Sequence, residues 1–141
     1  MLAVNATDVR KDFGRWIDTI VRKRPVIVKR SRDYFFGISL EAMKELVKDV
    51  EFTVLMDTED NGDVVLVLKD FGIVESGTTY EEALQNVIDE LREYTKQYFD
   101  EIEIWGRDAH RRTQLKELMK IICTESDNEL KGCFKCQHGE I

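Results

Sequence analysis

The feature that most constrains the fold of this sequence is an apolar run at helical spacing between residues 80 and 99. Its members recur at three- and four-residue intervals, which places them on one helical face: Ala83, Leu84, Val87, Ile88, Leu91, Tyr94 and Tyr98. Thr79 and Glu82 have the spacing of a capping box, which marks a helix start. The sequence therefore predicts a helix that begins after Thr79 and ends near residue 99.

Strand signals flank this helix. Residues 52–56 and 64–68 predict the two strands of a hairpin with Asn61-Gly62 at the tip of its turn. Ile73 and Val74 predict a third strand after the "KDFG" loop, and the fourth strand is predicted at Ile102, Ile104 and Trp105.

The remainder of the C-terminal part divides into a helix and a tail. Residues 108–124 predict an amphipathic helix whose inward residues are Leu115, Leu118, Met119 and Ile122. Residues 125–141 show little pattern and are expected to be loose.

The N-terminal part predicts a strand, a helix, a hairpin and a second helix. Residues 2–5 form the strand, and Thr7 is the expected cap of a helix that ends before Pro25. The apolar residues of that helix share one face: Val9, Phe13, Trp16, Ile17, Ile20 and Val21. Residues 26–28 and 34–38 predict the hairpin, and Ser39 caps a helix that carries Met43, Leu46, Val47 and Val50.

The two parts differ in charge, although the whole chain carries −7. Residues 1–50 hold 11 basic and 7 acidic residues, a net charge of +4, whereas residues 51–141 hold 10 and 21, a net charge of −11. Such asymmetry favours two modules with different partners. No apolar run is long enough to cross a membrane and no signal peptide is visible, so we expect a cytoplasmic protein.

The stretches "VNATDVRKDFGRWIDTIV", "RPVIVKR" and "GISLEAMKEL" resemble the N-terminal module of Phd/YefM-type, or prevent-host-death, antitoxins. The resemblance implies a module that dimerises and binds operator DNA to repress its own operon. It also implies DNA contact by Arg10 and Arg30, which fall on arginines of the family pattern. The sequence departs from that pattern in the hairpin, where "KRSRD" has no glycine.

The charge pattern agrees with this implication. Nine basic and two acidic residues lie from Arg10 to Arg32, and basic side chains near phosphates gain affinity by releasing counterions. The expected DNA-binding residues are Arg10, Lys11, Arg15, Lys29, Arg30 and Arg32. The alternative is that this segment is only a solvated helix face and a charged edge strand.

The stretch "KDFGIVESGTTYEEALQNVIDEL" resembles the HicB-like antitoxin domain. The residues that match the family pattern are Asp70, Gly72, Gly77, Thr79, Glu82 and Ala83. The resemblance implies a small α+β domain with a partly degenerate RNase-H-like arrangement, which neutralises a toxin and is not itself catalytic.

Two candidate metal sites carry less support. Five acidic residues gather around the predicted hairpin and could support a metal-dependent nuclease: Asp57, Glu59, Asp60, Asp63 and Asp70. Acidic residues in a mobile turn are the simpler explanation. Cys133, Cys136 and His138, with Cys123, could bind zinc, but a loose tail with free thiols is the simpler explanation.

The sequence therefore predicts an α+β protein with a Phd/YefM-like module at 1–50, a HicB-like domain at 51–105 with three or four strands and a long helix, and a C-terminal helix and tail at 106–141. We expect no catalysis and no cofactor. The expected function is that of a type II antitoxin, a dimer that represses its operon and neutralises a basic toxin. The alternative is a stand-alone transcriptional regulator whose acidic part senses a ligand or builds the oligomer.

Overall fold

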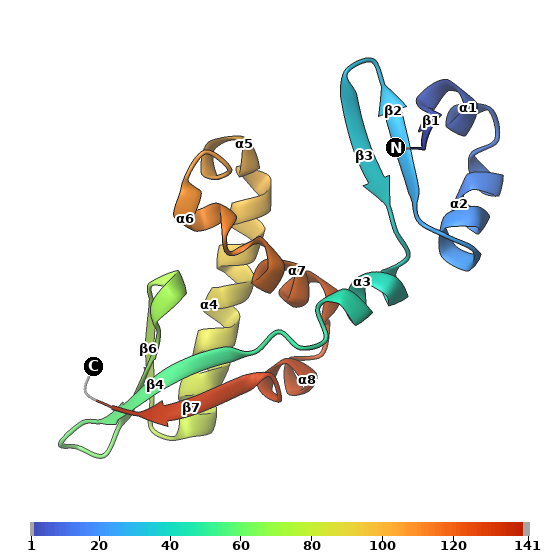
Figure 1. The fold of residues 1–141 in the computed structure, drawn as a ribbon. Coiled ribbons are helices and arrows are strands. Elements are labelled where there is room, and N and C mark those ends of the chain that lie inside the picture. The colour runs from blue at the N-terminus through green and yellow to red at the C-terminus, as the bar shows by residue number, and fades with distance from the viewer. Residues whose placement is uncertain (1, 140–141) are drawn as a thin grey trace. The chain divides into compact units, whose positions relative to one another are not determined.

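A computed structural model of the chain describes residues 2–139. The chain divides into two compact units, Met1–Leu46 and Val47–Ile141, and each is described by itself (Figure 1). Both units combine helices with a small mixed sheet, so the predicted α+β class is confirmed. Within the described residues, no helix is both long enough and apolar enough to cross a bilayer.

The first unit consists of a three-stranded sheet and three helices. Its elements in chain order are β1 (Ala3–Asn5), α1 (Ala6–Lys11), α2 (Phe13–Arg22), β2 (Val26–Arg30), β3 (Asp33–Gly37) and α3 (Leu40–Leu46). The strand order is β1-β2-β3, with β1 parallel and β3 antiparallel to β2. This is the predicted order of strand, helix, hairpin and helix, except that the first helix is divided.

The prediction of one continuous first helix capped by Thr7 is wrong. Asn5 is the cap: its Oδ1 accepts a hydrogen bond from the Thr7 backbone N–H at 3.0 Å, while its own backbone is extended. Asparagine is among the strongest N-cap residues, which explains why the helix begins at Ala6. The helix then breaks at Asp12, where φ is −146° and ψ is 64°.

The predicted apolar face of the first helix is buried only in part. Val9 forms the core of this unit with Val26 and Val28, and Trp16 and Ile20 pack against it. The remaining members of the face are exposed and lie four residues apart on α2: Phe13, Ile17 and Val21. The three short strands cover the side of α2 that carries Trp16 and Ile20, and the neighbouring stripe of Phe13, Ile17 and Val21 remains exposed to solvent.

The β2–β3 hairpin has a two-residue turn. Arg30 pairs with Asp33, and Ser31 adopts the left-handed φ of 56° that the missing glycine would otherwise supply. Ser39 caps α3 as predicted, because its Oγ accepts from the Ala42 N–H at 3.1 Å. The helix ends earlier than expected, at Leu46.

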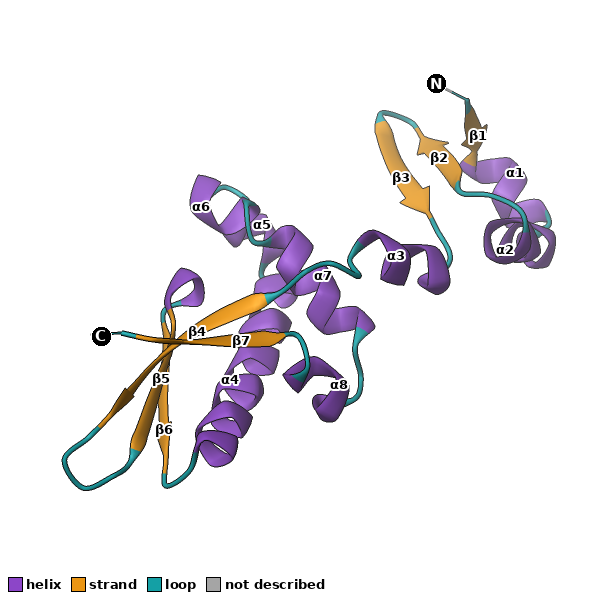
Figure 2. Cartoon of the chain, turned by 60° about the horizontal axis from the view of Figure 1, so that its bottom comes forward, coloured by secondary structure: helices purple, strands orange, loops and turns teal. Residues whose placement is uncertain are grey.

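The second unit consists of a four-stranded sheet, one long helix and several short helices (Figure 2). Its elements are β4 (Phe52–Thr58), β5 (Val64–Leu68), the 3-10 helix η1 (Lys69–Phe71), β6 (Ile73–Gly77), α4 (Tyr80–Asp100), α5 (Ile102–Trp105), α6 (Ala109–Arg112), α7 (Leu115–Cys123), α8 (Asp127–Lys131) and β7 (Phe134–His138). The strand order is β6-β5-β4-β7, and β7 alone runs parallel to its neighbour.

The long helix organises the core of this unit. Most of its predicted stripe is buried, including Val87, Ile88 and Leu91, and α4 packs against β5 and β6 on one side and α7 and α8 on the other. Thr79 caps the helix as predicted, since its Oγ1 accepts from the Glu82 N–H at 3.1 Å. The Glu82 carboxylate bonds to Thr78.

Two predictions for the C-terminal part are wrong. Ile102–Trp105 is a helical turn, and the fourth strand is β7, which comes from the tail that was expected to be loose. Leu130 is fully buried, and the Phe134 ring stacks on Phe52 with centroids 5.0 Å apart. These two apolar anchors hold a segment that is too short to show a clear period.

The predicted helix 108–124 is also divided, and its inward face differs from the prediction. Gln114 is buried and donates from Nε2 to the Asp70 carbonyl at 2.7 Å, so α7 turns Leu118 and Ile121 inward. Leu115 and Ile122, which were predicted to be inward, are about half exposed. A buried polar residue at the start of α7 therefore lies four residues before the buried Leu118.

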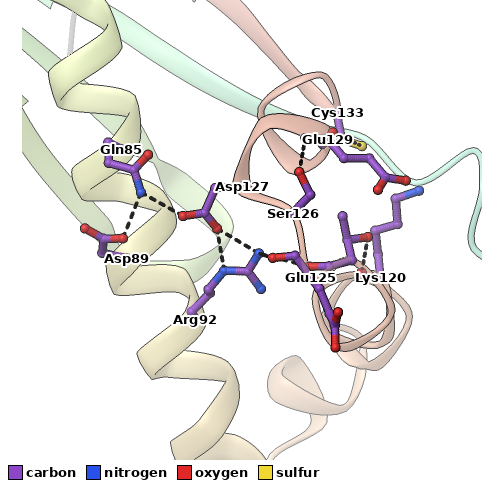
Figure 3. Close-up of polar contacts among 10 residues, drawn as sticks. Gln85, Asp89, Arg92, Lys120, Glu125, Ser126, Asp127, Glu129 and Cys133 are labelled. Carbon is purple, nitrogen blue, oxygen red and sulfur yellow. Dashed lines mark hydrogen bonds and ion pairs between the residues drawn. The ribbon is translucent and has the colours of Figure 1, made fainter.

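A hydrogen-bonded cluster joins the C-terminal segment to α4 (Figure 3). The Asp127 carboxylate accepts from Gln85 Nε2 at 3.0 Å and from Arg92 Nε at 2.8 Å. Arg92 also donates to the carbonyls of Thr124 and Glu125. The bonds from Gln85 and Arg92 hold the pKa of Asp127 below its ordinary value.

We expect Asp127→Ala to lower the free energy of unfolding by about 1 kcal/mol at neutral pH, because the charge-assisted bonds are lost from a partly exposed site. A carboxyl with a lowered pKa stabilises the fold above its ordinary pKa of 3.8 and loses this contribution as the pH falls through its pKa in the folded state. Urea unfolding at neutral and acidic pH should show that the difference in unfolding free energy between the wild type and Asp127→Ala decreases as the pH falls. Asp60→Ala, in an exposed turn, is the matched control. Equal unfolding midpoints for the two variants at neutral pH would contradict the assignment.

Candidate nucleic-acid interface

A groove of about 550 Å³ lies in the first unit, between the α1–α2 segment and the β2–β3 hairpin. Its walls carry the charged side chains of Arg10, Arg30 and Asp33 and the apolar side chains of Phe13 and Phe35. Val9 and Val28, which belong to the core of this unit, also line it. The groove thus combines two guanidinium groups and one carboxylate with an apolar floor.

The local sequence explains how the two arginines reach one groove. Arg10 lies in the last turn of α1, which Asn5 caps. Residues of a strand alternate between its faces, and Val26 and Val28 are buried toward the helices, so Arg30 lies on that same side. Among the described residues, no ion pair engages Arg10 or Arg30. Their charges are available to an anionic partner.

The other expected DNA-binding residues lie elsewhere. Lys29 is on the opposite face of β2, where its Nζ lies 5.6 Å from the centre of the Tyr34 ring. Arg15 forms an ion pair with Asp12 at 3.2 Å and lies over the ring of Trp16. Lys11 and Arg32 are exposed and do not line the groove.

The sequence identified both arginines of the groove but not their relation. It placed Arg30 with Lys29 and Arg32, whereas the structure places it beside the helix that carries Arg10. The alternation of Val26, Val28 and Arg30 along β2 is the signal that indicates this placement. Sequence reasoning missed Asp33 and Phe35 as members of the groove.

The first unit also exposes much apolar surface. The α2 stripe of Phe13, Ile17 and Val21 is 44–62% exposed, and Phe35 and Phe36 on the edge strand β3 are 59% and 58% exposed. Large exposed apolar patches mark interaction sites on soluble proteins. The surface available for association therefore lies on the same small unit as the groove.

The second unit has an acidic groove of about 390 Å³ between β6 and α4. Glu75, Glu90 and Glu93 line it together with Phe71 and Tyr94. Burial raises the pKa of Tyr94, whose hydroxyl donates to Gln114 Oε1. This groove presents carboxylates above an aromatic wall, an arrangement that suits a cationic side chain.

The candidate metal ligands are not brought together. Within residues 2–139, no group of three or more His, Cys, Asp or Glu side chains is arranged to hold a metal ion. Two of the hairpin acids form local hydrogen bonds instead: Asp57 accepts from the Thr58 N–H, and Asp63 accepts from Asn61 Nδ2. Cys123 is buried, and Cys133 Sγ contacts the Glu129 carbonyl at 3.6 Å.

Comparisons with known proteins relate the whole chain to antitoxins. The model of the PHD-like family, described as antitoxin of toxin-antitoxin, RelE/RelB, TA system, matches residues 1–135. A crystal structure from Syntrophomonas wolfei subsp. wolfei, the antitoxin part of a proposed toxin/antitoxin system, is similar with a TM-score of 0.90 and 29% identity. The similarity covers 99% of this chain and all of the other. No curated protein matches the chain.

The lining of the groove predicts that substitutions of Val28 and Phe35 differ in their effect on stability. Val28→Ala should lower the free energy of unfolding by about 2 kcal/mol, because Val28 is only 2% exposed and its methyl groups fill the core. Phe35→Ala should change it by less than about 1 kcal/mol, because the ring projects into an open groove. Urea denaturation of both variants provides the measurement. A larger loss for Phe35→Ala than for Val28→Ala would show that the groove is closed in solution.

Proposed function

This chain belongs to the PHD-like family of toxin–antitoxin antitoxins, and from that premise we propose that it is a type II antitoxin that binds operator DNA as a dimer and represses its own operon. We further propose that its acidic second unit neutralises a protein toxin. The DNA-binding part of the proposal rests on the observation that Arg10 and Arg30 line the same groove.

The groove supports phosphate and base contact for electrostatic reasons. Two arginines without ion-pair partners outweigh the one carboxylate, Asp33, in its lining. Arginine contacts with phosphates release counterions, and a bidentate contact with a base edge adds specificity. Arg10 is the proposed base reader because it lies on an exposed helix, and Arg30 on the strand is the proposed phosphate contact.

The exposed apolar surface supports a dimer. A unit of fewer than 50 residues buries little core, yet this unit leaves Ile17 and Val21 of α2 and Phe36 of β3 exposed, and none of these three lines the groove. Burial of that surface in a two-fold contact would stabilise the unit and present two grooves to two half-sites of an operator. The Phd/YefM resemblance of residues 1–48 points the same way.

The charge of the second unit supports a basic toxin as its partner. This part of the chain carries a net charge of −11, which repels phosphate and accelerates encounters with cationic surfaces. The acidic groove between β6 and α4 supplies a candidate contact surface. The HicB-like resemblance of residues 51–99 supports the same role.

We expect Arg10→Ala and Arg30→Ala to weaken operator binding while leaving the fold intact. Loss of the phosphate contact of Arg30 should lower affinity for all DNA and reduce the slope of log K against log salt by about 0.9. Loss of a base contact of Arg10 should cost about 1–3 kcal/mol and narrow the difference between operator and random DNA. Fluorescence anisotropy across a salt series measures both effects, with circular dichroism as the fold check.

Arg22→Ala is the matched control for these variants. Arg22 is also an exposed arginine of the first unit, but it is paired with Asp18 at 2.6 Å and lies outside the groove. Operator affinity of this variant should equal that of the wild type. If the two groove variants also bind like the wild type, the basic segment is only a charged edge and the DNA-binding proposal fails.

Toxin binding should depend on the acidic groove. We expect the Glu90→Lys/Glu93→Lys variant to associate more slowly, by about tenfold at low salt, with the product of the reading frame adjacent to its gene. The control variant Glu59→Lys/Asp60→Lys makes the same charge change in the β4–β5 turn. Stopped-flow or surface plasmon resonance measures the rates. A wild-type chain that binds operator DNA but not that product would favour the stand-alone regulator instead.

A further inference from the structure

The strand β7 forms an open edge of the sheet in the second unit. The strand order ends at β7, and Figure 1 shows it along β4. Four of its five residues are exposed, from Lys135 to His138. The strand contains no proline, and its Lys135 is engaged by Glu51 at 2.7 Å. Proline and unpaired lysine, which protect many sheet edges from pairing with another strand, are therefore not available at this edge.

The opposite edge of the same sheet is protected. Asn86 on α4 donates from Nδ2 to the carbonyl of Ser76 in β6 at 2.9 Å. This bond occupies an acceptor that an added strand would need. The two edges of this small sheet thus differ, and among the described residues β7 is the edge with no such bond to its outward groups.

The hydrogen bonds of the β4–β7 ladder show which groups face outward. The Phe52 N–H donates to the Cys133 carbonyl at 2.8 Å, and the Gly139 N–H donates to the Met56 carbonyl at 3.4 Å. In a parallel ladder, alternate residues of one strand face the neighbour, so the odd-numbered residues of β7 bond to β4. The N–H and C=O groups of Phe134, Cys136 and His138 therefore point away from the sheet.

We propose that the open edge of β7 pairs with β7 of a second copy of this chain, antiparallel and centred on Cys136. In this register, Cys136 faces its own counterpart, and Phe134 faces His138 of the second copy. All three outward-facing residues of both strands then exchange hydrogen bonds. The two sheets become one continuous sheet with a two-fold axis at its centre.

Charge decides between this register and its neighbours. With Cys136 on the axis, Lys135 lies opposite the neutral Gln137 of the second copy. A shift that centres the pairing on Lys135 places two lysines directly opposite each other, which is destabilising. A shift that centres it on Gln137 leaves Phe134 without a partner inside β7 of the second copy, Phe134–His138. The strand is self-complementary in one register, and this favours a second copy over an unrelated strand.

This contact is independent of the proposed DNA-binding dimer, because its residues belong to the second unit and that surface belongs to the first. A chain whose two contacts join it to different copies assembles beyond a dimer. The two surfaces therefore act as separate steps of assembly, and either can be lost without the other.

The Cys136→Asp and Cys136→Asn pair tests the proposal on the full chain. Aspartate places two carboxylates face to face on the axis, whereas the nearly isosteric asparagine adds no charge. Sedimentation equilibrium should show an assembly step weakened about fivefold or more for Cys136→Asp and unchanged for Cys136→Asn. Equal assembly of the two folded variants, or a wild type that is monomeric at tens of micromolar, overturns the proposal.

Two measurements on unaltered side chains keep the proposal testable if a variant does not fold. In hydrogen exchange, the Cys136 amide should be protected in the assembled wild type and exposed on dilution, while the amides of Lys135 and Gln137 stay protected throughout. Paired residues of this kind have Cα atoms about 5.5 Å apart, within reach of a disulfide. Oxidation by copper phenanthroline in air should therefore yield a reducible dimer linked through Cys136.

The outcomes of these measurements separate the alternatives. A Cys136 amide that becomes protected only when the toxin is added assigns the edge to a toxin strand and overturns the proposal. Failure to form the linked dimer, with Cys136 still reactive toward a maleimide, overturns it as well. Neither result affects the proposal that Arg10 and Arg30 bind DNA.

Discussion

The fold of the second unit depends on burying the apolar residues of α4, which other elements cover on two sides. The helix is 21 residues long and buries Ala83, Leu84, Val87, Ile88 and Leu91 almost completely. The sheet covers the side formed against β5 and β6, and the short helices α7 and α8 cover another. Burial of this stripe removes apolar surface from water, which is the main favourable contribution to folding. The remaining elements take their positions from it.

The Asp127 cluster is the polar counterpart of that packing. Asp127 is held by Gln85 and Arg92, which lie two turns apart on the same face of α4. Arg92 also donates to the carbonyls of Thr124 and Glu125 before α8. A short helix of five residues has little stability of its own. The bonds to α4, with the buried Leu130, fix α8 and thereby the start of β7.

The sequence predicted the elements that have a long apolar pattern. It did not predict the features that depend on a single polar contact. The stripe of α4, the β4–β5 hairpin and the caps Ser39 and Thr79 follow from period and residue type. The true cap Asn5 and the buried Gln114 could not be found by counting apolar residues, because each acts through one hydrogen bond. β7 was missed because its partner β4 lies far away in the chain. Arg10 and Arg30 were found by charge, but their common groove required the fold.

The parallel pairing of β4 with β7 has a consequence for the synthesis of the protein. The first strand of the second unit pairs with a segment far later in the chain, so the ladder cannot form on the ribosome until Phe134–His138 has been synthesised. The first unit has no such dependence, since its strands are close in sequence. A chain cut before Phe134 would keep the strands of the first unit but leave one edge of β4 without its partner. Loss of β7 would therefore expose one edge of β4 to pairing with other strands, which favours aggregation.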